Sequence, residues 1–309
     1  MKKNSSIYIA GHTGFVGNAL TCRLKRIGFK NLILMTRKEL DLVDQRKVNK
    51  LFKDLRPEYV FLLAAKVGGI YANNTYPAEF IYQNIAIQTN VIHAAYKYGV
   101  KKLLFVGSAC MYPKFCQQPM KEESLLSGYL EPTNEAYAVA KIAGIKMCQA
   151  YNQQYGTKFI SVIPASLYGI KDNFTSQDSH VLSALIRKVH EAKELRKKSV
   201  FVWGSGKPKR EFLYVDDFAN ACIFLINNYN SNEVINVGSG EDISIAELVF
   251  MIKELLDFKG KVVYNKTKPD GMPRKLLDVT KINDLGWKAK KQFKEGLKNT
   301  IEWYKKNLH

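Results

Sequence analysis

The sequence predicts an α/β protein with a doubly wound parallel sheet and a smaller C-terminal α/β domain. Two observations lead to this fold class. In the first half of the chain, short runs rich in Val, Ile, Leu and Phe alternate with amphipathic stretches, which is typical of parallel strands joined by helices. After Pro164 this alternation gives way to a long polar connection, IKDNFTSQDS. A chain of 309 residues is long enough for both domains.

The expected strands and helices follow from these patterns in chain order. Six strands are expected at residues 6–10, 32–36, 59–64, 102–107, 158–163 and 233–237. Helices are expected at residues 16–26, 46–54, 78–97, 135–155 and, after the polar connection, 180–193. We place the domain boundary near Tyr168, so that residues 1–168, rejoined by 212–240, form the first domain. Residues 169–211 and 241–309 then form the second domain.

Composition narrows the class of protein. Hydrophobic residues make up 46% and charged residues 24% of the chain, which is typical of a globular protein. The formal net charge is +19, from 47 Lys and Arg against 28 Asp and Glu, and such an excess suits nucleic acid, a membrane surface or small anions. The lysines are spread over the whole chain, without a helix-turn-helix, an aromatic-basic RNA motif or a zinc-type spacing. We therefore expect no nucleic-acid partner.

Targeting and metal-binding patterns are also missing from the sequence. No run of about 18 apolar residues occurs, so no membrane span is expected. The first residues lack the apolar core and cleavage site of a secretory signal. The five cysteines are scattered without a CxxC pair or a Cys/His cluster. This use of cysteine predicts a cytoplasmic protein without a metal site.

A glycine-rich loop joins the first expected strand to the first expected helix. Gly11, Gly14 and Gly17 form the pattern GxxGxxG there. The first glycine suits a tight turn, the second lets the backbone approach a pyrophosphate, and the third allows the helix to pack closely on the strand. The helix N-terminus adds free N–H groups and a positive dipole. The loop therefore predicts a Rossmann-type dinucleotide-binding domain of the short-chain dehydrogenase/reductase kind.

The end of the second strand indicates which dinucleotide is bound. Thr36, Arg37 and Lys38 stand where an NAD enzyme usually places an acid for the ribose 2′-hydroxyl. An arginine there suits a 2′-phosphate instead. The cofactor is therefore expected to be NADP(H) rather than NAD(H). The alternative is that Arg37 and Lys38 are ordinary surface charges.

A catalytic group is expected where the fourth strand meets the fourth helix. Tyr137 and Lys141 form YxxxK in a helical segment, and this spacing puts both side chains on one helix face. An ammonium group near a phenol lowers the tyrosine pKa and lets the hydroxyl exchange a proton with a carbonyl oxygen. Ser108 follows the fourth strand, at the sheet edge where ligands of such folds bind. These three residues together predict a reductase.

Long segments of the chain resemble the GDP-L-fucose synthase family of the extended short-chain dehydrogenase/reductase superfamily. They are IAGHTGFVG, AAKVGGIYANNTYPAEFIYQN, LLFVGSACMYPK, EPTNEAYAVAKIAGIK, VWGSGKPKREFLYVDD, INVGSG and KPDGMPRKLLDV. The resemblance implies a GDP-linked 4-keto-6-deoxy sugar as substrate, epimerised at C3 and C5 and then reduced at C4 by NADPH. It also implies a homodimer, formed by the helices at 78–97 and 135–155.

The resemblance assigns further residues to the site. For epimerisation it implies Cys110 and His180 as the base and acid that act on C3 and C5. The cofactor-binding residues that it implies are Gly11, Thr13, Gly14, Phe15, Val16, Gly17, Arg37, Leu42, Ala64, Lys141, Pro164, Leu167 and His180. The substrate-binding residues that it implies are Arg187, Lys188, Trp203, Arg210, Asp270 and Lys275. Cationic groups among them suit a diphosphate, and a carboxylate suits guanine N–H groups.

Departures from the family pattern leave an alternative open. Thr13 stands where the family often has a second NADP-binding arginine, and Lys188 stands where it usually has arginine. Where the family has PTNLYGP after the fifth expected strand, this chain has PASLYGI, so that Ser166 replaces an amide. A smaller residue there suits a larger sugar. The alternative is a C4 reductase of a GDP-6-deoxy-4-keto-heptose with little or no epimerase activity.

Two other functions are less well supported. A non-catalytic NADP-binding regulatory module would not need Ser108, Tyr137 and Lys141 together. A sugar-nucleotide 4,6-dehydratase of this superfamily would carry Asp and Glu where this chain has Ala109 and Cys110.

Overall fold

A six-stranded parallel sheet forms the centre of the computed structural model, which describes residues 1–175, 179–268 and 270–307. The strand order is β2-β1-β3-β4-β5-β9, and every pairing in it is parallel. The strands are β1 (Ile7–Ala10), β2 (Leu32–Ile33), β3 (Tyr59–Leu62), β4 (Lys102–Val106), β5 (Phe159–Pro164) and β9 (Ile235–Val237). The predicted α/β fold class is confirmed, although β2 is three residues shorter than expected.

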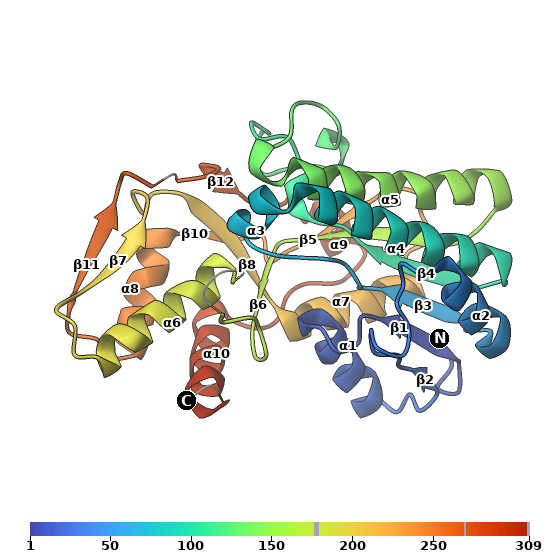
Figure 1. The fold of residues 1–309 in the computed structure, drawn as a ribbon, viewed down its shortest axis with the longest axis horizontal. Helices are drawn as coiled ribbons and strands as arrows, with labels where there is room; N and C mark the ends of the chain where they lie inside the picture. The colour runs from blue at the N-terminus through green and yellow to red at the C-terminus, as the bar shows by residue number, and fades with distance from the viewer. Residues whose placement is uncertain (176–178, 269, 308–309) are drawn as a thin grey trace.

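Helices cover both faces of this sheet (Figure 1). On one face lie α1 (Phe15–Arg26) and α7 (Val215–Asn228), which pack on each other. On the other lie α2 (Gln45–Leu55), α4 (Pro77–Lys97) and α5 (Glu135–Tyr155), with the short α3 (Ile70–Thr75) before α4. Local sequence explains the ends of these helices. The Asp44 carboxylate caps the N-terminus of α2, and Gly156, with φ 66°, ends α5 in a left-handed conformation.

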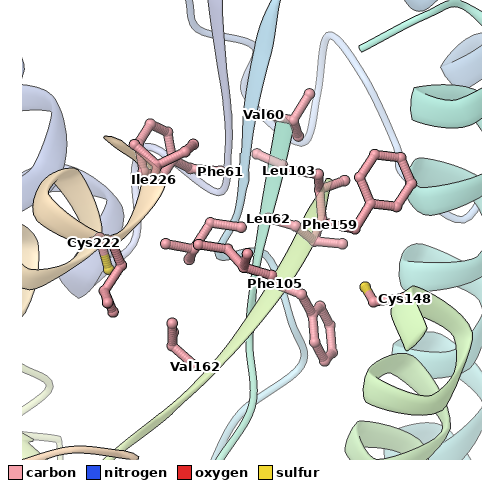
Figure 2. Close-up of a cluster of buried hydrophobic side chains, with 14 of the residues drawn as sticks. Val60, Phe61, Leu62, Leu103, Phe105, Cys148, Phe159, Val162, Cys222 and Ile226 are labelled. Carbon is pink, nitrogen blue, oxygen red and sulfur yellow. The ribbon is translucent and has the colours of Figure 1, made fainter. Parts of the chain in front are cut away.

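The sheet is buried on both faces, which explains its continuous apolar runs. Figure 2 shows Phe105 and Phe159 pointing toward Cys148 of α5. On the opposite face, Phe61 lies toward Ile226 of α7. Because successive side chains of a strand point to opposite faces, each strand supplies both layers of this core.

A second group of elements forms two smaller sheets with their own core. One sheet is β10-β8-β12 with β6 also paired to β8, and the other is β11-β7. The strands are β6 (Ser166–Tyr168), β7 (Ser199–Trp203), β8 (Lys209–Tyr214), β10 (Asp242–Ser244), β11 (Lys261–Asn265) and β12 (Arg274–Lys275). The helices are α6 (Val181–Glu194), α8 (Ile245–Leu255), α9 (Thr280–Asp284) and α10 (Phe293–Asn307). Ile186, Leu248 and Leu297 are fully buried in this second core.

The chain returns to the first sheet after β8. The residues of α7 and β9 belong to the first core, and β9 pairs with β5, whereas residues 212–214 lie in β8 of the small sheet. The domain boundary near Tyr168 remains a prediction. Residues 176–178 of the expected polar connection lie outside the described residues. Within the described residues, no helix has the length and apolarity that crossing a membrane requires.

Candidate functional site

The candidate site lies at the carboxyl ends of the parallel strands, where the strand order reverses. β1 pairs with β2 on one side and with β3 on the other, so the crevice beyond β1 and β3 is the topological switch point of the sheet. Gly11 follows β1 with φ 89°, and a Cβ there would lie 2.8 Å from the Ala64 nitrogen beyond β3. Only glycine allows this turn and this close approach of the two strand ends.

The N-terminus of α1 has the properties of an anion site. Gly14 is its N-cap and makes no side-chain cap, and the first turn carries no acidic residue. Phe15 and Val16 open the helix, and His12 beside it has a buried Nδ1 without a hydrogen-bond partner among the described residues. Free N–H groups and a positive helix dipole suit a pyrophosphate. The residues present therefore fit the dinucleotide that the glycine pattern predicts.

Substitution of Gly17 is expected to separate folding from cofactor binding. A Cβ at Gly17 would lie 2.0 Å from the Gly11 carbonyl oxygen, whereas a Cβ at Gly14 would meet nothing closer than 3.4 Å. We expect Gly17→Ala to lower the free energy of unfolding by about 1–3 kcal/mol, the usual cost of overpacking. Gly14→Ala should leave that energy unchanged and weaken NADPH binding. Urea unfolding and NADPH titration measure the two effects, and equal stability of both variants would contradict this account.

The residues after β2 present positive charge. Arg37 and Lys38 are exposed. The neighbouring Glu39 carboxylate turns back to accept hydrogen bonds from the Thr36 nitrogen and hydroxyl, each at 2.7 Å. These bonds lower the pKa of Glu39. The acid nearest the end of β2 is therefore engaged locally, which agrees with a 2′-phosphate partner for Arg37.

Ser108 and Tyr137 meet at the end of β4. Ser108 caps the short 3-10 helix η1 (Ala109–Met111), and its hydroxyl accepts from the Cys110 nitrogen at 3.3 Å. Burial raises the pKa of Tyr137, interaction with Cys110 raises it further, and a hydrogen bond with Ser108 lowers it in part. The YxxxK spacing predicted a lowered pKa, so the direction is opposite to the expectation. The phenol is thus held in its protonated form, which is the form that can donate a proton.

Lys141 is buried beneath the site. Its Nζ donates to the Val106 carbonyl oxygen at 2.8 Å and lies 4.7 Å from the centre of the Phe105 ring. Burial lowers the pKa of Lys141 to about 7, because desolvation disfavours the ammonium form. Lys141 therefore changes charge close to neutral pH.

This pKa predicts a pH dependence of stability. The folded chain releases the Lys141 proton near pH 7, whereas the unfolded chain keeps it up to the ordinary value of 10.5. Raising the pH above 7 therefore favours the folded state, by at most about 1.4 kcal/mol per pH unit. We expect the free energy of unfolding to rise by about 1–2 kcal/mol from pH ~7 to pH ~8.5 relative to Lys141→Met. Urea unfolding of both proteins at the two pH values measures this, and parallel pH profiles would contradict it.

Cations surround Cys110. The Lys275 Nζ donates to the Cys110 Sγ at 3.7 Å. Arg210 interacts electrostatically with Cys110 and with Asp270, and burial lowers the pKa of its guanidinium. The thiol is therefore placed between the Tyr137 phenol and two basic side chains from the second group of elements.

His180 is the second residue that the family resemblance assigns to epimerisation. It is the N-cap of α6 and is exposed. Its electrostatic partner is Asp172, a buried carboxylate that also accepts from the Ser183 hydroxyl. Burial raises the pKa of Asp172, and His180 lowers it in part. Asp172 was not among the predicted site residues, although it lies in the polar connection IKDNFTSQDS.

The remaining substrate-side residues form a cluster of charge and aromatic surface. The Trp203 ring is exposed and lies 5.1 Å from the Lys188 Nζ and 5.6 Å from the Lys268 Nζ. The Asp270 carboxylate accepts from the Ser205 nitrogen and hydroxyl at 2.6 and 2.8 Å. Arg187 makes an ion pair with Glu191 on its own helix at 3.0 Å. In the structure the Lys188 ammonium therefore lies near the Trp203 ring, and Arg210 interacts electrostatically with Asp270. Arg187 is instead paired with a residue of its own helix, α6.

The other expected cofactor residues lie around the same strand ends. Leu42 is buried, and its carbonyl oxygen accepts from Asn90 of α4 at 2.9 Å. Pro164 ends β5, Leu167 lies in β6, and Thr13 is exposed in the glycine loop. Within residues 1–175, 179–268 and 270–307, no three His, Cys, Asp or Glu side chains are grouped to hold a metal ion.

Comparisons with known proteins identify the family of this chain. The sequence profile of the NAD dependent epimerase/dehydratase family matches residues 7–238. The chain is 55% identical to GDP-L-fucose synthase 1 of Arabidopsis thaliana, over 99% of this chain and 95% of that protein. It is 51% identical to GDP-L-fucose synthase of Escherichia coli (strain K12), over 97% of each.

A solved structure shares the whole fold. It is the GDP-mannoheptose C4 reductase from Campylobacter jejuni with NADP bound, which matches with a TM-score of 0.92 and 46% identity over 99% of both chains. Full-length identity above half to two proteins of one family, together with this fold and site, decides the assignment. The chain belongs to the NAD dependent epimerase/dehydratase family and, within it, to the GDP-L-fucose synthase family.

Proposed function

We propose that this protein epimerises a GDP-linked 4-keto-6-deoxy sugar at C3 and C5 and then reduces its C4 ketone with NADPH. The observation that carries the proposal is the placement of Cys110 beside both Tyr137 and Lys275. This arrangement joins a thiol base to the Ser, Tyr and Lys of a reductase. The relatives named GDP-L-fucose synthase, at 55% and 51% identity, support the same pair of reactions.

The reductase half uses the residues at the end of β4 and in α5. NADPH, when bound, supplies the hydride that C4 receives. The Tyr137 hydroxyl donates a proton to the C4 oxygen, and its protonated state in this structure suits that role. Ser108 shares the hydrogen bond of this phenol and orients the same oxygen. Lys141 lies beneath them and would bind the nicotinamide ribose of the cofactor.

The epimerase half uses carbon acidity that the substrate brings. A ketone at C4 acidifies the C–H bonds at C3 and C5, so a base can remove each proton and form an enolate. In this proposal Cys110 removes the proton and His180 returns one to the opposite face. Asp172 interacts with His180, and an imidazole is a side chain that commonly returns protons in general acid–base catalysis.

The GDP part occupies the second group of elements. Trp203 offers an exposed ring for stacking on guanine. Arg187, Lys188 and Arg210 suit the diphosphate, and Asp270 suits the guanine N–H groups.

The cofactor is NADP(H), and Arg37 selects it over NAD(H) through the 2′-phosphate. The structure from Campylobacter jejuni has NADP bound. We expect Arg37→Met to raise the KM for NADPH by about tenfold, the effect of losing one charge-assisted contact. The KM for NADH should stay unchanged, because NADH lacks the 2′-phosphate. Initial rates with both cofactors measure this, and an equal loss for both would contradict the assignment.

A second candidate is a C4 reductase of a GDP-6-deoxy-4-keto-heptose. Ser166, partly exposed in β6, replaces the family amide two residues after Pro164, and the GDP-mannoheptose C4 reductase is 46% identical. The test offers GDP-4-keto-6-deoxymannose and its heptose homologue separately, with NADPH in heavy water. Turnover of the hexose with deuterium at C3 and C5 supports the primary proposal. Turnover of the heptose without deuterium at either carbon supports the second candidate and overturns the first.

The protein is proposed to be a cytoplasmic homodimer. Its α4 and α5 pack on each other along their length and expose Tyr82, Ile85 and Val139. Such apolar side chains on paired helices favour a four-helix interface with a second copy. Light scattering on the purified protein tests this. The proposed location rests on the scattered cysteines of the sequence, a pattern that suits a reducing compartment.

A further inference from the structure

Two basic side chains from neighbouring strands converge on Cys110. Arg210 of β8 and Lys275 of β12 are directly paired in a parallel register, so both side chains lie on one face of the small sheet. Lys275 reaches the Cys110 Sγ at 3.7 Å, and Arg210 interacts with the same sulfur electrostatically. The sequence analysis assigned Lys275 to the substrate diphosphate, but here its ammonium contacts the thiol.

The backbone of β12 is fixed by a buried carboxylate. Glu211 follows Arg210 and points to the opposite face, where it is 2% exposed. Its oxygens accept from the Leu277 nitrogen at 2.9 Å and from the Gly240 nitrogen at 2.8 Å. The bond to Leu277 holds the chain directly after β12, the strand that carries Lys275, against β8. Burial raises the pKa of Glu211 to about 7, so this anchor is most secure in its ionised form above that pH.

A second set of bonds ties β12 to the chain beyond Cys110. The Gln118 Oε1 accepts from the Leu276 nitrogen at 2.9 Å, and the Met120 nitrogen donates to the Leu276 carbonyl oxygen at 2.8 Å. Because residues 118–120 belong to the segment that follows η1, the strand carrying Lys275 and the turn carrying Cys110 are held as one unit. The contact between ammonium and sulfur is therefore built into the fold.

We propose that Lys275 is a positioning residue for epimerisation, whose ammonium stabilises the thiolate of Cys110. The inference rests on the proposed function, in which Cys110 is the base. A thiolate, not a thiol, removes a proton, and a fixed cation at this distance favours the charged form. Once Cys110 accepts a proton from C3 or C5, its negative charge passes to the enolate oxygen.

Three side chains from two parts of the fold interact with Cys110. Tyr137 approaches from α5 as a protonated phenol, and Arg210 and Lys275 approach from the small sheet. The interaction with Cys110 raises the pKa of Tyr137, because two negative charges close together repel. Lys275 thus supports the thiolate for epimerisation and, through it, the phenol for reduction.

The experiment measures the reactivity of Cys110 directly. Wild type, Lys275→Met, Lys275→Arg and the control Lys209→Met are alkylated with iodoacetamide, and peptide mass spectrometry follows Cys110 with exposed Cys22 as internal reference. Lys209 is exposed on β8, so its removal deletes the same charge. We expect Lys275→Met to slow alkylation of Cys110 relative to Cys22 by about fivefold to tenfold, as a Coulomb term at this distance implies. Lys275→Arg and Lys209→Met should react like wild type.

Two further readouts separate a charge effect from a structural one. Raising the pH should restore the Lys275→Met rate toward that of wild type, because hydroxide then ionises the thiol without help. A deficit that is equal at every pH, or an unchanged rate in Lys275→Met, would overturn the proposal. Deuterium incorporation at C3 and C5 tests the proposed function separately. If wild type incorporates none, epimerisation is refuted while the alkylation rates still decide whether Lys275 acts on Cys110.

Discussion

Replacing Tyr137 with Phe is expected to lower kcat for C4 reduction by about 10²–10⁴-fold, the usual contribution of a general acid. The phenol is partly buried, protonated and hydrogen-bonded to Ser108, so its removal leaves the C4 oxygen without a proton donor. The ring itself should stay in place, because it packs edge-on against Phe80 with centroids 6.2 Å apart. NADPH oxidation at saturating substrate measures kcat, and the KM should change little.

The same variant tests whether the two halves of the reaction are separable. Because the proposed mechanism assigns C3 and C5 to Cys110 and His180, Tyr137→Phe should still exchange those hydrogens with heavy water. A matched control is Tyr129→Phe, since Tyr129 is 96% exposed. If exchange and hydride transfer fall together in Tyr137→Phe but not in the control, Tyr137 serves both halves and the separate assignment is wrong.

Local patterns were enough to predict the first sheet. A GxxGxxG loop indicates a dinucleotide site only between a strand and a helix. Here a strand pattern precedes the loop and a helix pattern follows it. The close approach of Gly11 to Ala64 and of Gly17 to Gly11 then follows from the missing side chains. The predicted β2 was too long because it is an edge strand. It pairs with β1 alone and only through Leu32 and Ile33, and residues 34–36 leave the ladder although β1 continues to Ala10.

Contacts between distant segments could not be predicted from spacing. The i, i+4 pairing of Tyr137 and Lys141 suggested a lowered tyrosine pKa, but burial of the phenol dominates and Lys141 bonds to Val106 instead. The approach of Lys275 to Cys110 spans 165 residues of chain and depends on the register of β12 against β8. Such pairings are set by tertiary packing, which residue spacing within a single sequence does not reveal.

Replacing Cys110 with Ser is expected to have the complementary effect to Tyr137→Phe. A serine hydroxyl is a far weaker acid than a thiol, so the basic form is lost although the shape of the side chain is nearly kept. We expect deuterium incorporation at C3 and C5 to fall by about 10²–10⁴-fold, whereas hydride transfer to C4 continues. The product should then be a reduced 6-deoxy sugar that keeps the substrate configuration at C3 and C5, which nuclear magnetic resonance of the isolated sugar nucleotide can establish.

The control for this prediction is Cys116→Ser, because Cys116 is a free, partly buried thiol in the segment that follows the same turn. It should exchange both hydrogens as wild type does. An inverted, deuterated product from Cys110→Ser would show that another group is the base. Loss of hydride transfer together with exchange would instead show that reduction requires the epimerised ketone. In that case epimerisation by Cys110 must precede reduction by Tyr137. The configuration of the substrate, and not the placement of the side chains, would then impose the order of the two reactions.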